Sequence, residues 1–417
     1  MKPFQFTYLL VFSFFMAFGQ SYEEKIDSLI KDAIVQQAFP GATILVKKNG
    51  KDLFHKTYGY FTYDSLLPVS TNTLYDLASV TKIAAGLPVV MKLVQDGKLT
   101  LDDPFSNYWH PWKRKKDKKA ITLREILAHQ AGLEPYIVFL SKVRKKNGNL
   151  KKRLVRNQPS KRFAKQAYNN RYIKTGFYKK MYRTINRSPV SKEKTYRYSG
   201  LFFLLLPELV QQLTGVDFET YLNQEIYEPL EITNLVFNPS LKQSNLSIIP
   251  TESDSIFRND VTVGWVHDEN AALLGGVSGN AGLFGTAEDL AKLMEFYRNL
   301  GKYKGRQIID KEIVRSFIKI QYPENHNRRG LGFDKPLIGN DTLSIFEAYP
   351  SPHVSKESFG HAGFTGTFVW ADPKEQLVYI FLSNRVYPSR THRKIYDLKI
   401  REKVQDVFYN LPKIQKQ

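Results

Sequence analysis

A serine followed three residues later by a lysine is the pattern in this sequence with the most direct route to nucleophilic chemistry. Residues three apart lie on one face of a helix, so the lysine amine would contact the serine hydroxyl and ease removal of its proton. The pattern occurs four times, at Ser28/Lys31, Ser79/Lys82, Ser191/Lys194 and Ser316/Lys319. Spacing alone therefore does not select the nucleophile.

The surrounding sequence favours Ser79. Residues 74–78 have the composition of an extended segment and lead into a strongly apolar helix predicted over 81–95. The Ser79 hydroxyl and N–H would then lie at a helix N-terminus, where the helix dipole stabilises developing negative charge. The alternative interpretation is that Ser79 only caps the helix.

Three segments resemble the signatures of β-lactamase-related serine hydrolases, the superfamily of serine β-lactamases and penicillin-binding proteins. The first is 77–82 (LASVTK), followed by two further family-like stretches, 92–104 (KLVQDGKLTLDDP) and 121–133 (ITLREILAHQAGL). The second is 196–205 (YRYSGLFFLL). The third is 359–367 (FGHAGFTGT), which is similar to the His-x-Gly version on the edge strand of the esterase-like and peptidase-like branches. The three signatures occur in the family's order.

The resemblance implies a role for individual residues. Ser79 would attack a carbonyl group, and Lys82 and Tyr198 would move its proton. His361 would orient Tyr198 or the leaving group. The backbone N–H groups of Ser79 and Phe364 would form the oxyanion hole.

One position departs from the family pattern. The second signature is Tyr-x-Asn in class C β-lactamases and related esterases, whereas here Gly200 stands in place of the asparagine. Glycine has no amide to bind substrate or to hold the active-site lysine, and Ser199 could compensate only if it turns inward. The residues predicted to bind substrate are Ser199, Gly200, Gly363 and Thr365.

A further stretch, 264–286 (GWVHDENAALLGGVSGNAGLFGT), resembles a segment shared by secreted muropeptide amidases and β-lactamase-like domains fused to cell-wall glycosidases. Its His267-Asp268-Glu269 run is a weak candidate for a metal site, because adjacent loop residues rarely converge on one ion. We expect no metal and no other cofactor. His129 is predicted to be structural, ending its helix and supporting the site from outside.

The elements that must position these residues follow from periodicity. Apolar spacing predicts an N-terminal helix over 22–36 and a closing helix over 395–409. A hairpin is predicted around Asn49-Gly50, and a second strand pair over 366–371 and 376–384. Helices ending at glycine are predicted in between, over 81–95, 122–128, 201–213 and 287–299.

This order predicts a mixed α+β fold in which an antiparallel sheet with flanking helices carries an inserted helical domain. The resemblance implies that the fold is of the β-lactamase/transpeptidase type. Residues 20–417 would form a single catalytic domain. Its sheet part would comprise 22–75 and 330–417, and its helical part 76–329.

Charge is concentrated in one part of the 417-residue chain, whose formal net charge is +21. Between residues 141 and 190 there are seventeen Lys or Arg and no Asp or Glu. We expect a partly helical basic insertion over 141–194, either a solvated surface or a site for an anionic envelope polymer or membrane face. Its interleaved aromatic residues could also stack on sugars: Tyr168, Tyr172, Phe177, Tyr178 and Tyr182.

The N-terminus predicts export. Lys2, the apolar run 4–18 and the small residues Ala17 and Gly19 are typical of a cleaved signal peptide, 1–19, although an uncleaved membrane anchor would look similar. A secreted or periplasmic location makes nucleic acid an unexpected partner. The absence of cysteine excludes disulfides, thiolate metal sites and a cysteine nucleophile.

Three functions are compatible with these features. The first is a secreted serine hydrolase that cleaves an amide or ester bond in peptidoglycan-derived muropeptides through a Ser79 acyl-enzyme. The second is a small-ester hydrolase or weak β-lactamase, which would use the same machinery. The third is a catalytically inactive binding protein for anionic envelope polymers, a hypothesis that Gly200 favours.

Overall fold

The computed structural model describes residues 21–242 and 245–411. The predicted signal peptide therefore lies outside the described residues. In the described part, no single helix combines the length and the apolar composition needed to cross a bilayer. One pair, Leu201–Thr214 and Phe218–Tyr227, meets both conditions only when it is joined across a bend of 80°.

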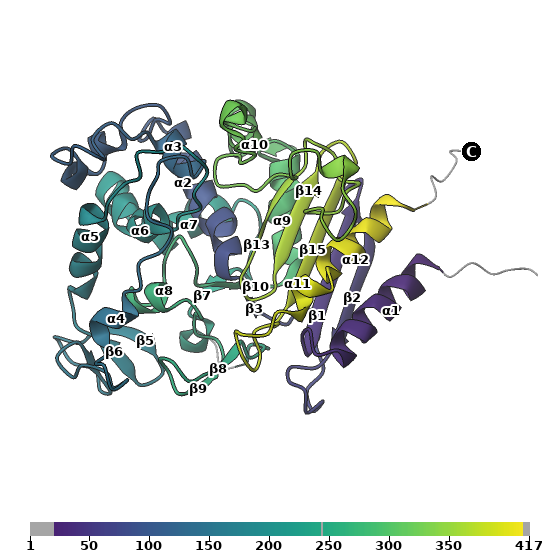
Figure 1. Cartoon of the computed structure of the whole chain (residues 1–417), viewed down its shortest axis with the longest axis horizontal. Coiled ribbons are helices and arrows are strands. Elements are labelled where there is room, and N and C mark those ends of the chain that lie inside the picture. Colours follow the sequence, from purple (N-terminus) through teal and green to yellow (C-terminus); the bar gives the residue numbers. More distant parts are fainter. Residues whose placement is uncertain (1–20, 243–244, 412–417) are drawn as a thin grey trace, which may run out of the picture.

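A five-stranded antiparallel sheet of order β13-β14-β15-β1-β2 forms the centre of the fold (Figure 1). Strands β1 (Gly41–Lys48) and β2 (Lys51–Gly59) come from the N-terminal part of the chain. Strands β13 (Phe359–Ala362), β14 (Phe368–Asp372) and β15 (Leu377–Ser383) come from the C-terminal part. The predicted sheet is confirmed, and the strand with the third signature lies at its edge.

The β1–β2 hairpin turns where the sequence predicted. Asn49 and Gly50 have φ values of 53° and 77°. A two-residue hairpin turn with positive φ at both positions matches the twist of the flanking strands, and Asn-Gly is the pair that tolerates it best. The turn therefore fixes the register of the first strand pair.

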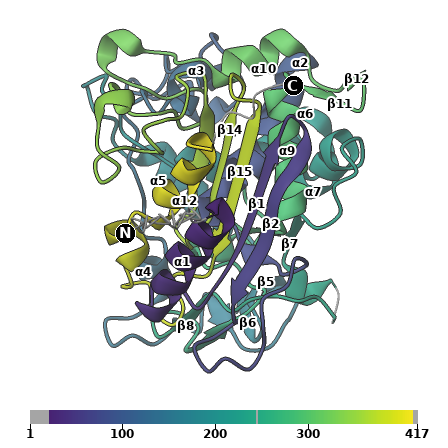
Figure 2. The ribbon, with the colours of Figure 1, turned by 90° about the vertical axis from the view of Figure 1, so that its right-hand side faces the viewer.

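Helices cover both faces of the sheet. Successive side chains of a strand point to opposite faces, so Ile44 packs in the core formed with α1 (Tyr22–Val35) and α12 (Ile400–Tyr409). Leu45 packs in the other core, which includes α9 (Ala287–Arg298). Figure 2 looks onto the face that α1 and α12 cover.

One predicted helix is two in the structure. The segment expected as a single helix over 395–409 forms α11 (Lys394–Asp397) and then α12. The break occurs at Lys399, whose φ of 53° lies in the left-handed region that an α-helix does not contain.

The larger core lies in the helical region beside the sheet. The main helices there are α2 (Leu87–Gln95), α3 (Leu123–Leu127), α6 (Leu201–Thr214), α7 (Phe218–Leu222), α8 (Glu269–Leu273) and α10 (Lys311–Ile318). Three small sheets lie among these helices. In the first, β3 (Tyr75–Asp76) and β7 (Val236–Phe237) pair on either side of β10 (Leu283–Gly285). In the other two, β8 (Glu252–Asp254) pairs with β9 (Asp260–Thr262), and β11 (Lys302–Tyr303) pairs with β12 (Arg306–Gln307).

The helix predicted over 81–95 is interrupted. Lys82–Gly86 forms a π-helical turn, and the α-helical part begins only at α2. Pro88 has no N–H with which to bond the Ala84 carbonyl, and that carbonyl instead accepts from the Tyr227 hydroxyl at 3.0 Å. The widened turn thus starts at Lys82, the residue predicted to activate the nucleophile.

The basic insertion contains more β-structure than expected. It comprises α4 (Leu140–Val143), β4 (Val155–Arg156), β5 (Lys165–Tyr168), β6 (Arg171–Ile173) and α5 (Phe177–Arg187), with strand order β4-β6-β5. Strands of two to four residues are too short to show alternation in a sequence. In Figure 1 the insertion lies on the side of the molecule away from α1 and α12.

Candidate active site

Ser79 and Lys82 are in direct contact. Lys82 is 3% exposed, and its Nζ donates to Ser79 Oγ at 3.0 Å and to the backbone oxygen of Asn280 at 2.9 Å. The i, i+3 spacing thus places amine and hydroxyl side by side. Of the four Ser-x-x-Lys matches, Ser79/Lys82 has the amine-to-hydroxyl contact that nucleophilic chemistry needs.

The turn before Ser79 is fixed by a buried carboxylate. Ser79 lies in a 3₁₀ turn, Ala78–Val80, and Ala78 has a φ of 44°. The carboxylate of Asp76 accepts the Ala78 N–H at 2.8 Å and the His267 N–H at 2.7 Å. These two bonds hold the backbone in a conformation that a non-glycine residue rarely adopts, and strain of this kind is common at catalytic positions.

Tyr198 and His361 lie beside this pair. Lys82 Nζ is 5.4 Å from the centre of the Tyr198 ring, and the Tyr198 and His361 rings are 6.2 Å apart. Both side chains present a buried polar atom, the Tyr198 hydroxyl and His361 Nε2. Within residues 21–242 and 245–411 neither atom has a hydrogen-bond partner. A buried polar atom without a partner is costly, and both of these atoms keep an unused capacity for a hydrogen bond.

His361 is uncharged at neutral pH. Its Nδ1 lies 2.8 Å from the Ala362 carbonyl, which can only accept, so Nδ1 carries the hydrogen and Nε2 carries a lone pair. Burial, reinforced by the positive charges of Arg329 and Lys82, lowers the pKa of His361 to about 3. The ring therefore offers a hydrogen-bond acceptor to the site.

His129 supports Tyr198 from behind. It follows α3 with a φ of 56° and accepts the Ser199 N–H at Nδ1 over 3.2 Å. Its ring packs on the Tyr198 ring with 4.6 Å between centres. Burial holds the pKa of His129 well below its ordinary value, with smaller contributions from Arg329 and Lys82. The contacts are those of a structural residue that fixes the tyrosine.

Two of the side chains predicted to bind substrate form hydrogen bonds to the backbone instead. The Ser199 hydroxyl donates to the Glu134 carbonyl at 2.7 Å and accepts the N–H of Leu201, the first residue of α6, at 3.3 Å. The Thr365 hydroxyl is 1% exposed and donates to the Asp76 carbonyl at 2.6 Å. Both hydroxyls bond backbone groups of the fold, and a role for Ser199 or Thr365 in substrate binding stays a prediction.

Gly200 faces the reactive lysine, as its place in the second signature implied. A Cβ built on it would lie 3.9 Å from Lys82 Cε and 4.0 Å from Asn280 Cβ, which is ordinary contact distance. The backbone oxygen of Asn280 is the group that accepts from Lys82 here. A main-chain carbonyl therefore holds the lysine where Gly200 offers no side chain.

The turn between β13 and β14 is bonded to the turn before Ser79. The Thr367 hydroxyl donates to the Leu77 carbonyl at 3.1 Å, and Thr365 binds the neighbouring carbonyl. A Cβ on Gly363 would come within 2.1 Å of Thr367 Oγ1 and 2.5 Å of the Leu77 oxygen, so this close approach requires glycine. The turn thereby packs against the backbone of Asp76 and Leu77, immediately before the 3₁₀ turn that contains Ser79.

Phe364 is held on both sides while its ring remains 48% exposed. The Arg385 guanidinium lies 4.4 Å from the ring centre, and Arg385 Nε donates to the Phe364 carbonyl at 2.8 Å. On the other side the His267 ring stacks at 5.7 Å with an angle of 25°. These contacts fix the peptide whose N–H is the second predicted oxyanion donor.

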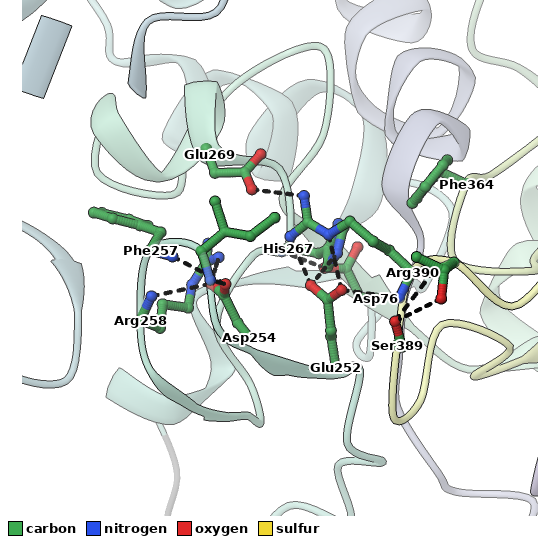
Figure 3. Close-up of polar contacts among 12 residues, drawn as sticks. Asp76, Glu252, Asp254, Phe257, Arg258, His267, Glu269, Phe364, Ser389 and Arg390 are labelled. Atoms are coloured by element: carbon green, nitrogen blue, oxygen red, sulfur yellow. Dashed lines mark hydrogen bonds and ion pairs between the residues drawn. The ribbon is translucent and has the colours of Figure 1, made fainter. Parts of the chain in front are cut away.

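The His267-Asp268-Glu269 run spreads over different partners. His267 Nε2 lies 2.8 Å from Glu252, and Glu269 accepts from Arg390 at 2.9 Å (Figure 3). Asp268 accepts from Asn280 Nδ2 at 3.1 Å. Among the described residues no group of three or more His, Cys, Asp or Glu is arranged to hold a metal ion.

Glu252 is the centre of the network in Figure 3. It accepts three bonds from Arg390 at 2.6 to 2.9 Å and contacts His267. Burial alone would raise the pKa of Glu252, but the bonds from His267 and Arg390 outweigh it and lower the pKa to about 2. The network holds the His267 ring in contact with Phe364, and it holds the His267 backbone N–H in its hydrogen bond to Asp76.

Several residues of the site have no counterpart in the sequence-based prediction. Asn280 lies in the 264–286 stretch, where its polar type among glycines and alanines was the available signal, and Asp268 was considered there only as a weak metal candidate. Arg329 gave no signal, yet it is 2% exposed, pairs with Asp334 at 2.9 Å and lies 5.8 Å from the Tyr198 ring. Its contribution depends on contacts that only the folded chain creates.

Comparison with known proteins agrees with this geometry. The chain is similar to "Putative D-alanyl-D-alanine carboxypeptidase" of Escherichia coli O157:H7, 30% identical over 378 residues that cover 84% of this chain and 80% of the relative. It is 29% identical over 387 residues to an N-acetylmuramyl-L-alanine amidase of Bacillus subtilis strain 168, covering 87% of this chain and 80% of the relative.

A solved structure shares the fold. EstCE1, described as a hydrolase with promiscuous acyltransferase activity, matches with a TM-score of 0.65 at 18% identity, covering 92% of this chain and 98% of that chain. The family model described as Beta-lactamase matches residues 26–402. The chain therefore belongs to the Beta-lactamase family and is a hydrolase of that family.

Proposed function

We propose that this hydrolase is exported and that it cleaves an amide or ester bond in peptidoglycan-derived muropeptides through an acyl-enzyme at Ser79. The carrying observation is the 3.0 Å contact between Lys82 Nζ and Ser79 Oγ. The names of the carboxypeptidase and amidase relatives support the substrate class. The apolar N-terminal run supports export.

Acylation follows from the placement of the groups. Ser79 Oγ forms a bond to the substrate carbonyl carbon while its proton passes to Lys82 or Tyr198. The same proton is then given to the leaving nitrogen or oxygen as its bond to the carbonyl carbon breaks. The N–H groups of Ser79 and Phe364 stabilise the negative charge that develops on the carbonyl oxygen.

Deacylation reverses the proton transfers. A water molecule gives one proton to the Lys82–Tyr198 pair and adds to the ester carbon, and Ser79 leaves as the alcohol by taking that proton back. The neutral His361 presents its Nε2 lone pair and holds a donor group of the substrate, the water or Tyr198 in position. It acts by orientation, because its low pKa keeps it from carrying the proton at neutral pH.

The test is intact-mass spectrometry of the mature protein after treatment with a fluorophosphonate and, separately, a penicillin. We expect one adduct with at least one probe in the wild type and in Ser28→Ala, which alters an exposed serine of another Ser-x-x-Lys match. We expect no adduct in Ser79→Ala. If the wild type forms no adduct with either probe, the acyl-enzyme is ruled out and the inactive binding protein is the better hypothesis.

Substrate and export need their own measurements. Muropeptides, short-chain esters and nitrocefin are compared by kcat/KM, and we expect the highest value for muropeptides. A preference for short esters or nitrocefin would replace the proposed substrate by the small-ester or β-lactam alternative, which the likeness to EstCE1 keeps open. N-terminal sequencing of the protein from producing cells checks for cleavage near Gln20.

A further inference from the structure

The basic insertion carries cations that the fold does not neutralise. Of its seventeen Lys and Arg between residues 141 and 190, fourteen are exposed. None of the seventeen forms an ion pair with a carboxylate of the residues that the structure describes. The ion pairs nearest to this range along the chain are Arg197–Glu134 and Lys194–Glu125, whose residues lie on either side of it. This surface therefore has a positive electrostatic potential, which is screened by ions in the solvent and not by neighbouring carboxylates.

Within this surface, the connection from β4 to β5 forms a groove of about 570 Å³, called here the basic groove. Three cations and three uncharged polar residues line it together with Val155, Pro159 and Phe163: Lys152, Arg156, Arg162, Asn157, Gln158 and Ser160. The lining combines positive charge with hydrogen-bond donors, the chemistry that phosphate oxygens require.

The groove is held open by ordered backbone. Ser160 and Phe163 exchange backbone hydrogen bonds of 3.3 and 2.8 Å, which close a tight turn with Lys161 and Arg162 at its tip. Thr175 N–H binds the Arg162 carbonyl at 2.7 Å and anchors that turn to the end of β6. Arg156 lies 5.6 Å from the centre of the Phe163 ring. The backbone of this loop therefore needs little further ordering when an anion binds.

The character of the surface favours a hydrophilic polymer over a membrane. Membrane-binding surfaces commonly add apolar side chains that enter the lipid. The exposed large apolar side chains of the described chain include Tyr136, Val138 and Tyr196 on either side, but none between residues 141 and 190. A partner that offers charge alone fits this surface.

We propose that the basic groove and the cations around it form a docking surface for a linear polyanion that carries phosphate groups. The segment just before α4 is bonded to the 264–286 stretch, since Asn270 of α8 donates to the Ile137 carbonyl at 2.9 Å, and the same stretch contributes the Asn280 carbonyl that accepts from Lys82. Docking would hold the hydrolase on a phosphate-bearing polymer while Ser79 remains accessible. The docking surface does not depend on which bond Ser79 cleaves.

The test measures binding of long-chain inorganic polyphosphate to the mature protein by fluorescence anisotropy over a range of sodium chloride. We expect binding that weakens steeply with salt. In the triple variant Lys152→Glu, Arg156→Glu, Arg162→Glu, we expect at least about tenfold weaker binding and a salt slope smaller by about 3, one unit per lost phosphate contact.

A matched variant separates the groove from net charge. Lys25→Glu, Lys31→Glu, Lys51→Glu makes the same charge change on exposed residues of α1 and β2, away from the insertion. We expect its affinity to stay within about twofold of wild type, because a distant charge is screened. Equal losses in both triples would overturn the groove as a site. Circular dichroism and Ser79 adduct formation show that each triple is folded.

Vesicles provide the competing outcome. We expect vesicles of phosphatidylcholine with phosphatidylglycerol to bind more weakly than polyphosphate at equal phosphate concentration. Tighter binding to these vesicles would overturn the polymer in favour of a membrane surface. A neutral triple, Lys152→Gln, Arg156→Gln, Arg162→Gln, replaces the reversal variant if that one fails to fold, and the same loss is expected.

Discussion

Charged side chains around Ser79 are paired one by one, whereas those of the basic insertion face solvent without a carboxylate partner. Asp334 contacts Arg328 and Arg329, Glu252 contacts Arg390, and Lys82 contacts two oxygens. Among the described residues, none of the seventeen cations of the insertion has a carboxylate partner, and Arg144, Lys151 and Arg171 bond only carbonyl and amide oxygens.

Burial explains the difference. An unpaired charge in a protein interior costs several kcal/mol, so every charge that helps to shape the active site must have its own hydrogen bonds. Exposed cations are hydrated and screened, so the fold tolerates many of them. We therefore expect substitutions near Ser79 to act individually through geometry, and substitutions in the insertion to act through the sum of charge.

Exchanging one cation in each region gives the sharpest contrast. Lys82→Met removes the amine from Ser79, and we expect the acylation rate to fall by about 10²–10⁴-fold, the usual contribution of a general acid–base group. Lys179→Met removes an exposed cation of α5, and we expect a change within about twofold. Both are measured as rates of adduct formation. Similar losses in the two variants would show that the regions are not distinct.

Two glycines of the site test geometric fit. Gly363→Ala would force a Cβ against Thr367 and the Leu77 carbonyl, so we expect about 1–3 kcal/mol loss of unfolding free energy and a clear loss of activity. Gly200→Ala has room beside Lys82, so we expect less than about 1 kcal/mol. Urea denaturation measures both. A larger loss for Gly200→Ala would contradict the packing described here.

Acid unfolding tests the pairing of Glu252. Its folded pKa of about 2 lies below its unfolded value of 4.5, so its stabilisation is complete above that value and is lost as the pH falls toward about 2. The difference corresponds to about 3 kcal/mol. We expect Glu252→Gln to lose that amount at neutral pH and to converge with wild type near about pH 2.

An exposed glutamate serves as the control for this acid titration. Glu324→Gln lies at the surface, outside the ion pairs of the described chain, and we expect its unfolding curve to follow wild type across the range. Urea unfolding at several pH values gives both curves. A constant difference between Glu252→Gln and wild type down to acid pH would contradict the lowered pKa.

Salt should have a weak effect on stability through the insertion, and this effect should be stabilising. Screening of the repulsion among its exposed cations is expected to raise the unfolding free energy by about 0.5 kcal/mol between low and high sodium chloride. Lys179→Gln, Lys180→Gln, Arg183→Gln on α5 should reduce this gain. Thermal unfolding in a salt series measures it. A loss of stability with salt would mean that ion pairs outweigh the repulsion.

Local pattern predicted the fold and the contact between Ser79 and Lys82. The i, i+3 spacing of Ser79 and Lys82 is a property of a few residues, and so is the Asn49-Gly50 turn. The interrupted helix after Lys82 was missed because the Ala84 carbonyl is satisfied by Tyr227, far along the chain. The hydrophobic periodicity of a sequence identifies the buried face of a helix, but it does not identify a hydrogen-bond donor that lies so far along the chain.

Side-chain direction near the site could not be predicted from sequence. Ser199 and Thr365 are in the expected signatures, but their hydroxyls bond the backbone of Glu134 and Asp76. The partner that replaces the missing asparagine amide is the Asn280 carbonyl, eighty residues beyond Gly200. Every residue has a main-chain carbonyl oxygen, so residue type does not indicate which of them accepts this bond. Only the folded chain shows it.

The sheet that carries the edge strand pairs Ala42 with Ser383, residues more than three hundred positions apart. Contacts of such long range slow folding, because a long loop must close before they form. The Ser79 turn is bonded to Thr365 and Thr367, so it has no firm support until the C-terminal strands have been synthesised and have joined β1. A nascent or truncated chain should therefore carry the serine and lysine without a working catalytic centre, and activity arises only once the last strand is in place.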